Sequence, residues 1–286
     1  MRKILFPTNF GEASYNAFIF AERIAAKFGA EIDVVNIYDG LFDHNALYLK
    51  PESLQNRTKT ITQKLEEFAS LTPNEDEIAS AVRLNYKVTL AYQKTLKIIE
   101  LARDYDFVVL GINSIVSAEK RVFGSFASNI IQNVACPVLI VPKDAVYKGF
   151  DTLTYASDWN MLNYAMIRQI ALFARHFNAF VDFIDISDNK ATDSIAFELL
   201  KNTFEQIAPK SPYSSTHLDT NFALKGLYRY LLDNDTDLLT IVNRKRGWYE
   251  NLLGGSMTQE LAIRTKTPIL SYHSRQAIHS NSTYIN

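Results

Sequence analysis

The sequence is short of the features that mark several protein classes. It has a single cysteine, Cys136, so no disulfide can form within the chain. No hydrophobic run approaches the roughly 18–20 residues that a membrane-spanning helix needs. The apolar run in the first ten residues, "MRKILFPTNF", is too short for a signal peptide. We therefore expect a cytoplasmic protein with no membrane partner.

The sequence also lacks an excess of charge of either sign. Lys and Arg number 30 and Asp and Glu number 31, and the two kinds are nearly balanced in each half of the chain. A dedicated nucleic-acid-binding protein would carry a positive excess, so no nucleic-acid partner is expected. The 286 residues, 47% of them hydrophobic, are enough for two folded domains.

In the first half, short apolar segments alternate with amphipathic ones. This order is typical of a parallel α/β sheet with helices on both faces. The predicted strands are 3–8, 31–38, 78–88, 107–112 and 137–141, and the predicted helices are 12–30, 52–71, 91–106 and 126–134. Gly29 lies where a helix C-cap is expected.

The same series of elements occurs again in the second half. "DTLTYASDWN" corresponds to "RKILFPTNFG", and "TPILSY" corresponds to "CPVLIV". We therefore predict two tandem domains of five parallel strands each, at 1–145 and 149–273, followed by a polar tail at 274–286. The last strands, "PVLIV" and "PILSY", would be exposed sheet edges, so we expect them to pair in an intrachain pseudo-dimer.

In an open parallel sheet, ligands bind at the carboxyl ends of the strands. In the first half, the segments that arrive there are Thr8 and Asn9, the end of the second strand around Ile37, and the loop from Gly111 to Ser125. That loop contains Ser114 and Gly124, and it leads through Ser125 and Phe126 into a predicted helix. A helix N-terminus and nearby glycines favour a bound phosphate.

The segments "ILFPTNF" and "VVLGINS…FGSFASNIIQNVACPVLIV", with their counterparts in the second half, resemble the universal stress protein family. The resemblance implies a Rossmann-like nucleotide-binding sandwich. In members that bind nucleotides, it also implies an aspartate after the first strand and a loop of pattern G-x2-G-x9-G-[ST]. Its implied ligand here is ATP with Mg²⁺, held by Thr8, Asn9, Ile37, Gly111, Ser114, Gly124, Ser125 and Phe126.

Both halves depart from that pattern. In the first half, Asn9 stands at the aspartate position and Ser114 at the middle glycine, which predicts a weakened site. In the second half, Asp158 keeps the aspartate. There, aligning Asn243 with the first glycine puts Arg246 at the second and leaves a span one residue shorter, which predicts a vestigial site.

Three functions remain open at this point. The first is a stress-related binding or signalling module with a nucleotide and an unidentified protein partner. The second is a slow ATP hydrolase or phosphoryl-transfer enzyme, and the third is a ligand-free scaffold. No catalytic residue is predicted, since Ser14 and Ser157 have no evident histidine partner in the sequence. No metal site is predicted either, because His44 with Asp39 and Asp43 lacks an established ligand spacing.

Overall fold

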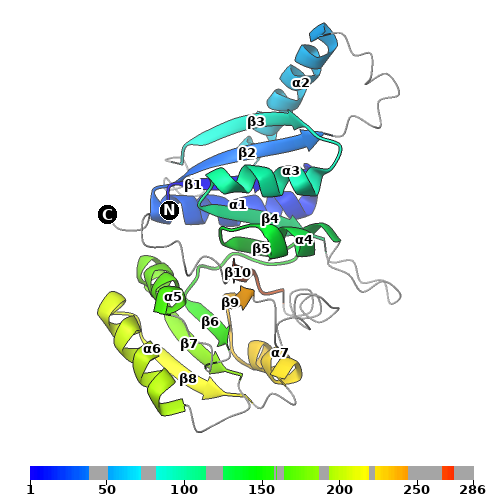
Figure 1. Cartoon of the computed structure of the whole chain (residues 1–286). Helices are drawn as coiled ribbons and strands as arrows, with labels where there is room; N and C mark the ends of the chain where they lie inside the picture. The colour runs from blue at the N-terminus through cyan, green and yellow to red at the C-terminus, as the bar shows by residue number, and fades with distance from the viewer. Residues whose placement is uncertain are drawn as a thin grey trace.

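A computed structural model gives the fold of the chain (Figure 1). It describes residues 1–38, 51–71, 82–113, 125–157, 159, 164–186, 193–218, 223–243 and 266–273. The metal-site candidates at 39–50 and the expected polar tail at 274–286 lie outside these residues, as do Ser114, Gly124, Asp158 and Arg246.

The described strands form one ten-stranded sheet in the order β3-β2-β1-β4-β5-β10-β9-β6-β7-β8. Within each half, every pairing between neighbouring strands is parallel. The strands are β1 (Lys3–Pro7), β2 (Glu31–Tyr38), β3 (Leu84–Leu90), β4 (Phe107–Ile112), β5 (Val138–Pro142), β6 (Thr152–Ser157), β7 (Phe180–Asp185), β8 (Tyr213–His217), β9 (Leu238–Asn243) and β10 (Ile269–His273).

The two halves join where β5 meets β10. These strands pair antiparallel, with Leu139 opposite Leu270. The predicted pairing of the last strands is therefore confirmed. The pairing hides two apolar edges that would otherwise be free to template association with another chain.

Helices cover both faces of the sheet (Figure 1). The parallel-sheet α/β class that the sequence predicts is therefore confirmed. The helices are α1 (Glu12–Phe28), α2 (Pro51–Ser70), α3 (Lys94–Leu101) with a short 3-10 turn η3 (Ala102–Asp104), α4 (Ser125–Asn133), α5 (Tyr164–Phe177), α6 (Asp193–Ile207) and α7 (Ala223–Asp233).

Two hydrophobic cores lie on opposite faces of the sheet. The core under α1, α2, α5 and α6 runs through both halves, from Phe18 in α1 to Phe204 in α6. The core on the other face lies under α3, α4 and α7, and includes Ile98 and Leu227. Burial of these apolar surfaces is the main force that holds the helices on the sheet.

Aromatic rings strengthen the join on the α1 side. Phe28, in the last turn of α1, stacks on His176 of α5 with ring centroids 4.2 Å apart. Phe150, in the connection between the halves, packs edge-to-face on Phe177 at 5.0 Å. Asn16 of α1 donates to the backbone oxygens of Pro142 and Ala145, which ties the end of β5 to this helix.

The structure places the third strand later than the sequence indicates. The predicted strand at 78–88 is observed at Leu84–Leu90. Its alternating pattern is compatible with several registers, and pairing with β2 selects one, from Ile32–Leu84 to Tyr38–Leu90. The predicted helix at 91–106 is shorter, because α3 begins at Lys94 and tightens into η3.

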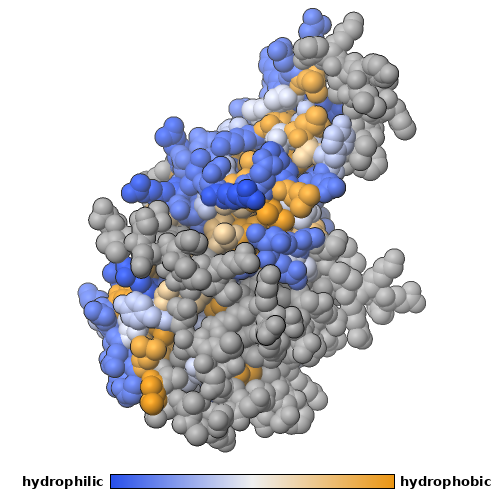
Figure 2. All heavy atoms as spheres, in the orientation of Figure 1, coloured by the Kyte–Doolittle hydropathy of each residue, from blue (hydrophilic) through white to orange (hydrophobic). Residues whose placement is uncertain are grey.

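The long amphipathic helix predicted at 52–71 is present as α2. Figure 1 shows it reaching beyond the edge of the sheet, and Figure 2, in the same orientation, shows hydrophilic and hydrophobic residues side by side on it. Its buried residues, Leu65, Phe68 and Ala69, all lie in its last two turns. Among the described part of the chain, then, only the C-terminal portion of α2 contributes to the core.

Candidate site at the carboxyl edge of the first half

The turn after β1 is held by its own side chains. The Phe10 amide donates to Thr8 Oγ1 at 3.0 Å, and the Gly11 amide donates to Asn9 Oδ1 at 3.0 Å. Ser14 Oγ, in the first turn of α1, also donates to Asn9 Oδ1, at 2.9 Å. Asn9 therefore uses its carbonyl oxygen to shape the entry into α1, as Asn commonly does at such turns.

Phe10 is the one residue of this turn with a left-handed backbone. Its φ is 64°, a conformation that costs an ordinary residue energy. The ring is 37% exposed and packs edge-to-face on Phe68 of α2. The turn thus combines local backbone strain, a feature that clusters at functional sites, with a partly exposed aromatic ring.

The end of β2 contacts the same turn. Asn36 Nδ2 donates to the Thr8 carbonyl at 2.9 Å, and the Thr8 amide donates to the Val35 carbonyl at 2.9 Å. Ile37 follows in β2, but its side chain is buried in the core on the α3 side. Only the backbone of Ile37 is therefore placed to contribute to a ligand at this edge.

Gly111 lies in β4, directly below the first turn of α1. A Cβ atom added there would lie 2.1 Å from the carbonyl oxygen of Ala13 and 2.8 Å from the Ser14 nitrogen. No side chain fits between this strand and that helix. Close packing alone is therefore sufficient to require glycine at position 111, whether or not a phosphate binds.

The remaining predicted residues lie at the start of α4. Ser125 is the first residue of that helix, and Phe126 is 39% exposed in its first turn. The first amide groups of any α-helix lack intrahelical acceptors, so a phosphate near this end of α4 could accept hydrogen bonds from them. Ser114 and Gly124 are outside the described residues, so their roles remain predictions.

The strand register corrects our alignment of the second half. In the first half Gly111 pairs with Val141, and in the second half Val242 pairs with Tyr272. Val242, rather than Asn243, therefore corresponds to Gly111. Counting from it, Lys245 rather than Arg246 matches Ser114, and the span to Gly255 equals the span from Gly111 to Gly124. The sequence alignment was wrong by one residue because neither Val242 nor Lys245 is a glycine that could anchor it.

The corresponding edge of the second half is filled by different side chains. Trp159, at the position of Phe10, is only 6% exposed and stacks on Phe197 of α6 at 5.8 Å. Asp185, at the position of Asn36, accepts the Trp159 amide at 3.1 Å and pairs with Nδ1 of His217 at 3.0 Å. A carboxylate and an indole thus occupy positions that hold an amide and a partly exposed phenyl ring in the first half.

A buried polar cluster in the first half has no counterpart among the sequence predictions. Asp33 of β2 accepts hydrogen bonds from Tyr105, at 2.5 Å, and from Lys87 and Asn85. Burial by itself raises the pKa of this carboxyl, but the three donors outweigh burial and hold it below its usual range. Burial, with the bond to Asp33, raises the pKa of Tyr105 to about 12.

This cluster is explained by packing rather than by a ligand. Each polar group in it has a partner within the cluster, as buried polar groups require. The signal in the sequence was the odd aspartate in the apolar strand "EIDVVNIY", which lines up with Asp182 in "FVDFID". The pairing partners, Lys87 and Tyr105, could not be found without the strand register.

Two other kinds of site find no support in the described part of the chain. Burial raises the pKa of the Cys136 thiol to about 12, which disfavours the thiolate form that a catalytic or redox cysteine needs. No group of three or more His, Cys, Asp or Glu side chains gathers as metal ligands would among the described residues. The helices within those residues include none with the length and hydrophobicity to cross a bilayer.

Comparison with known proteins agrees with this geometry. Residues 1–142 match the model of the universal stress protein family. The chain belongs to this family through its first half. A universal stress protein of Methanocaldococcus jannaschii is 28% identical over 149 residues, which cover 50% of this chain and 82% of that protein.

Solved structures extend the likeness of fold to the second half. A universal stress protein from Archaeoglobus fulgidus superposes with a TM-score of 0.65 at 16% identity, covering 95% of this chain and 96% of that chain. A universal stress protein solved in complex with cAMP matches 50% of this chain and 98% of its own, with 20% identity and a TM-score of 0.37. The first of these shows that the fold of both halves together is shared with one universal stress protein structure along nearly the whole of each chain.

Proposed function

We propose that the protein is a tandem universal stress protein that acts as a binding or signalling module in the cytoplasm. Its ligand would be a nucleotide, ATP with Mg²⁺, held weakly by phosphate contacts at the carboxyl edge of the first half. The two domains would be residues 1–145 and 149–273, arranged as an intrachain pseudo-dimer about the β5–β10 pairing, with a protein partner still to be identified.

One observation carries the proposal. The turn after β1, the end of β2 and β4 meet around Thr8, through the bonds of Thr8 to Val35 and Asn36 and the contact of Gly111 with α1. This meeting point lies between β1 and β4, where the strand order reverses. Open α/β sheets bind ligands at that position, outside the carboxyl ends of the strands.

The weakness of the site is argued from Asn9. Its carbonyl oxygen already accepts two hydrogen bonds within the turn, and an amide brings no charge to a metal ion. An Mg²⁺ ion bridging the phosphates would normally be held by a carboxylate. We therefore expect low affinity, and binding rather than hydrolysis.

The second half supports the vestigial reading. Trp159 is buried against Phe197 at the edge where a base or phosphate would enter, and Asp185 places a carboxylate beside it. A buried carboxylate would repel a triphosphate at close range. On these two features we expect the second site to be empty.

The test is a calorimetric titration of ATP into the full chain, with and without Mg²⁺. Gly124→Val should abolish binding, because the bulky side chain keeps the backbone away from phosphate, while Asp158→Ala should leave it unchanged. Circular dichroism of both variants controls for folding. If only Asp158→Ala loses binding, the sites are ranked the wrong way round. If titration of the wild type with ATP gives no heat, the ligand-free scaffold is favoured instead. Release of phosphate from ATP above background would favour the slow ATP hydrolase.

A further inference from the structure

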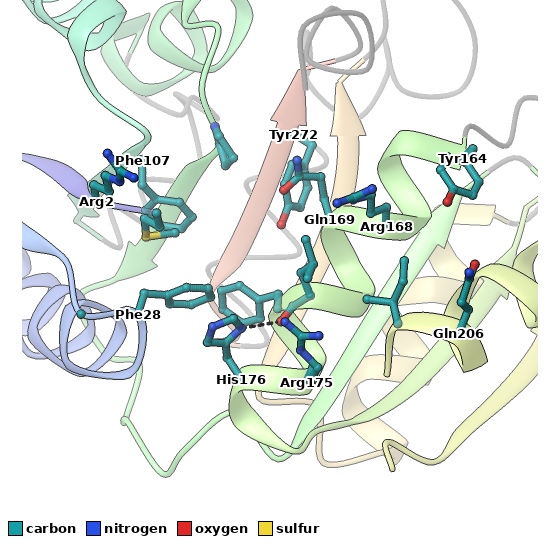
Figure 3. Close-up of a pocket in the computed structure, with 16 residues that line it drawn as sticks. Arg2, Phe28, Phe107, Tyr164, Arg168, Gln169, Arg175, His176, Gln206 and Tyr272 are labelled. Atoms are coloured by element: carbon teal, nitrogen blue, oxygen red, sulfur yellow. Dashed lines mark hydrogen bonds between the residues drawn. The ribbon is translucent and has the colours of Figure 1, made fainter. Parts of the chain in front are cut away.

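A hollow lies between the two halves, at the edge of the first-half strands opposite Thr8 and Asn9. Its volume is about 650 Å³, which is within the usual range for small-molecule sites. One wall comes from the starts of β1, β4 and β5 and the end of α1, and the other from α5, α6 and β10 (Figure 3). Neither half can form it alone.

Cationic side chains reach this hollow from both walls. Arg2 comes from the first half, and Arg168 and Arg175 come from α5 of the second half (Figure 3). No aspartate or glutamate is among its described lining residues. Within the described part of the chain, none of these three guanidinium groups forms an ion pair. The nearby Asp106 is engaged with the backbone amides of Arg2 and Lys3.

The arginines are not explained by the packing of α5. The core face of this helix consists of Met166, Ile167, Ile170, Ala171, Phe173, Ala174 and Phe177. The residues that face the hollow form a separate stripe, which includes Arg168, Leu172 and Arg175 at helical spacing. Complementing the helix dipole accounts for Arg175 in the last turn. It does not account for Arg168, two turns earlier, or for Arg2 on the facing wall.

Flat apolar and amide groups lie beside the charges. Phe28, Phe107 and Tyr164 line the hollow, with Gln169 and Gln206 as hydrogen-bonding groups (Figure 3). His176 is held in place by stacking on Phe28 and by its Nδ1, which donates to the Leu172 carbonyl at 2.8 Å. The site thus combines fixed aromatic surface with donors suited to a doubly charged oxyanion.

We infer that this inter-half hollow binds a small phosphate monoester with a flat apolar body, and that the bound molecule clamps the two halves together. The surplus of positive charge along the walls of the hollow favours the double charge of a phosphate monoester over the single charge of a carboxylate, and a guanidinium group can bond two phosphate oxygens at once. Since the ligand contacts both halves, its binding should stabilise the join between them.

The experiment uses the full chain and the probe 1-naphthyl phosphate, followed by calorimetry and by thermal unfolding. The phosphate ester should bind and raise the melting temperature, 1-naphthoate should bind less tightly, and uncharged 1-naphthol should not bind. Affinity should fall as salt is raised, because the contacts are charged and partly exposed. Equal binding of 1-naphthol and the ester would overturn the inference, since only the apolar surface would then matter.

Variants locate the site. Arg168→Gln and Arg2→Gln should each lower the affinity about tenfold, the loss typical of one charged hydrogen-bond partner. Arg229→Gln is the matched control: it removes the same charge from the exposed face of α7, and affinity should not change. Gln169→Glu should abolish binding, because it adds a negative charge at a partly exposed position in the lining of the hollow.

A further variant separates this site from the nucleotide site. Gly124→Val should leave the binding of 1-naphthyl phosphate intact while abolishing that of ATP. If instead Gly124→Val removes the probe and Arg168→Gln does not, the probe binds at the carboxyl edge and the inter-half site does not exist. The inter-half site is also ruled out if binding of the probe survives each of Arg168→Gln, Arg2→Gln and Gln169→Glu.

Discussion

The two halves share a strand order and a hydrophobic core, yet they carry different residues at three equivalent positions. The position below the first helix is Gly111 in one half and Val242 in the other. The aromatic residue after the first strand is Phe10, partly exposed, or Trp159, buried. The residue that holds this turn is Asn36 or Asp185.

The first of these differences concerns packing. Glycine lets the first turn of α1 lie directly on β4. Val242, at the equivalent strand position, is a fully buried side chain. The same position therefore serves close approach of a helix in one half and side-chain packing in the other, while the strand pairing stays the same.

The largest expected effect comes from making the first half resemble the second. Gly111→Val should reduce the free energy of unfolding by about 3 kcal/mol or more, because its Cβ would overlap the Ala13 carbonyl and the helix must move. Chemical denaturation measures it. A loss below about 1 kcal/mol would show that α1 can shift at little cost and that close packing does not explain this glycine.

The reverse change should cost less. Val242→Gly removes a fully buried side chain and adds backbone freedom, so we expect a loss of about 2–3 kcal/mol in the same denaturation experiment. Val242→Ala serves as the control that separates lost packing from glycine flexibility. Were Val242→Gly to stabilise the protein, α5 would be under strain from the valine, and the comparison drawn above would fail.

The buried aspartates offer a comparison by pH. Asp33 is paired with the cations of Lys87 and, at 3.5 Å, Lys3, whereas Ser214, a neutral residue, donates to Asp182. Asp33→Asn should therefore cost about 1–2 kcal/mol at pH 7, limited by the half-exposed Lys87 ammonium, which water can solvate. Asp182→Asn should cost less, since no cation loses its partner.

The sign of the pH dependence follows from the lowered pKa of Asp33. A group with a depressed folded pKa adds stability above its unfolded pKa, near 4, and loses that stability as the pH falls through the folded value. Asp33→Asn should therefore flatten the decline in stability below about pH 4. Urea denaturation from pH 2 to pH 7 tests it, and an unchanged slope in the variant would contradict the pairing with Lys87.

How far the sequence predicts this molecule depends on the kind of contact. Periodicity and the internal repeat were sufficient for the α/β class and for the β5–β10 pairing, because burial of apolar edges is encoded locally in "PVLIV" and "PILSY". They were not sufficient for the strand register, since a two-residue alternation fits several positions. The third strand at Leu84–Leu90 and the match of Val242 to Gly111 both needed partner strands.

For the candidate site, too, the sequence predicted the segments involved but not the contacts between them. Thr8 and Asn9 were expected at the carboxyl edge, and their segment meets the ends of β2 and β4 there. The packing role of Gly111 depends on a helix that starts almost a hundred residues earlier, so no local pattern contains it. The cationic hollow brings Arg2, at the start of the first half, to Arg168 and Arg175 in α5 of the second half, which sequence spacing cannot predict.

The smallest expected effect concerns the nucleotide site itself. Restoring the family pattern with Asn9→Asp and Ser114→Gly should raise ATP affinity several-fold, about 1 kcal/mol, the net worth of an ordinary recovered contact. An aspartate at position 9 can still accept the hydrogen bonds of Gly11 and Ser14, so the turn is preserved. Its charge beside the N-terminus of α1 is also favourable.

The part of the gain that comes from Asn9→Asp should appear with Mg²⁺ and vanish without it, because a bare carboxylate repels the triphosphate and only a bridging cation reverses the sign. Titration of the wild type, each single variant and the double variant separates the two contributions. Ser114→Gly alone should act equally with and without the metal. If the wild type already binds ATP at sub-micromolar concentration and the double variant binds no more tightly, then Asn9 and Ser114 are tolerated variants of an intact site, and the carboxyl edge of the first half is not weakened at all.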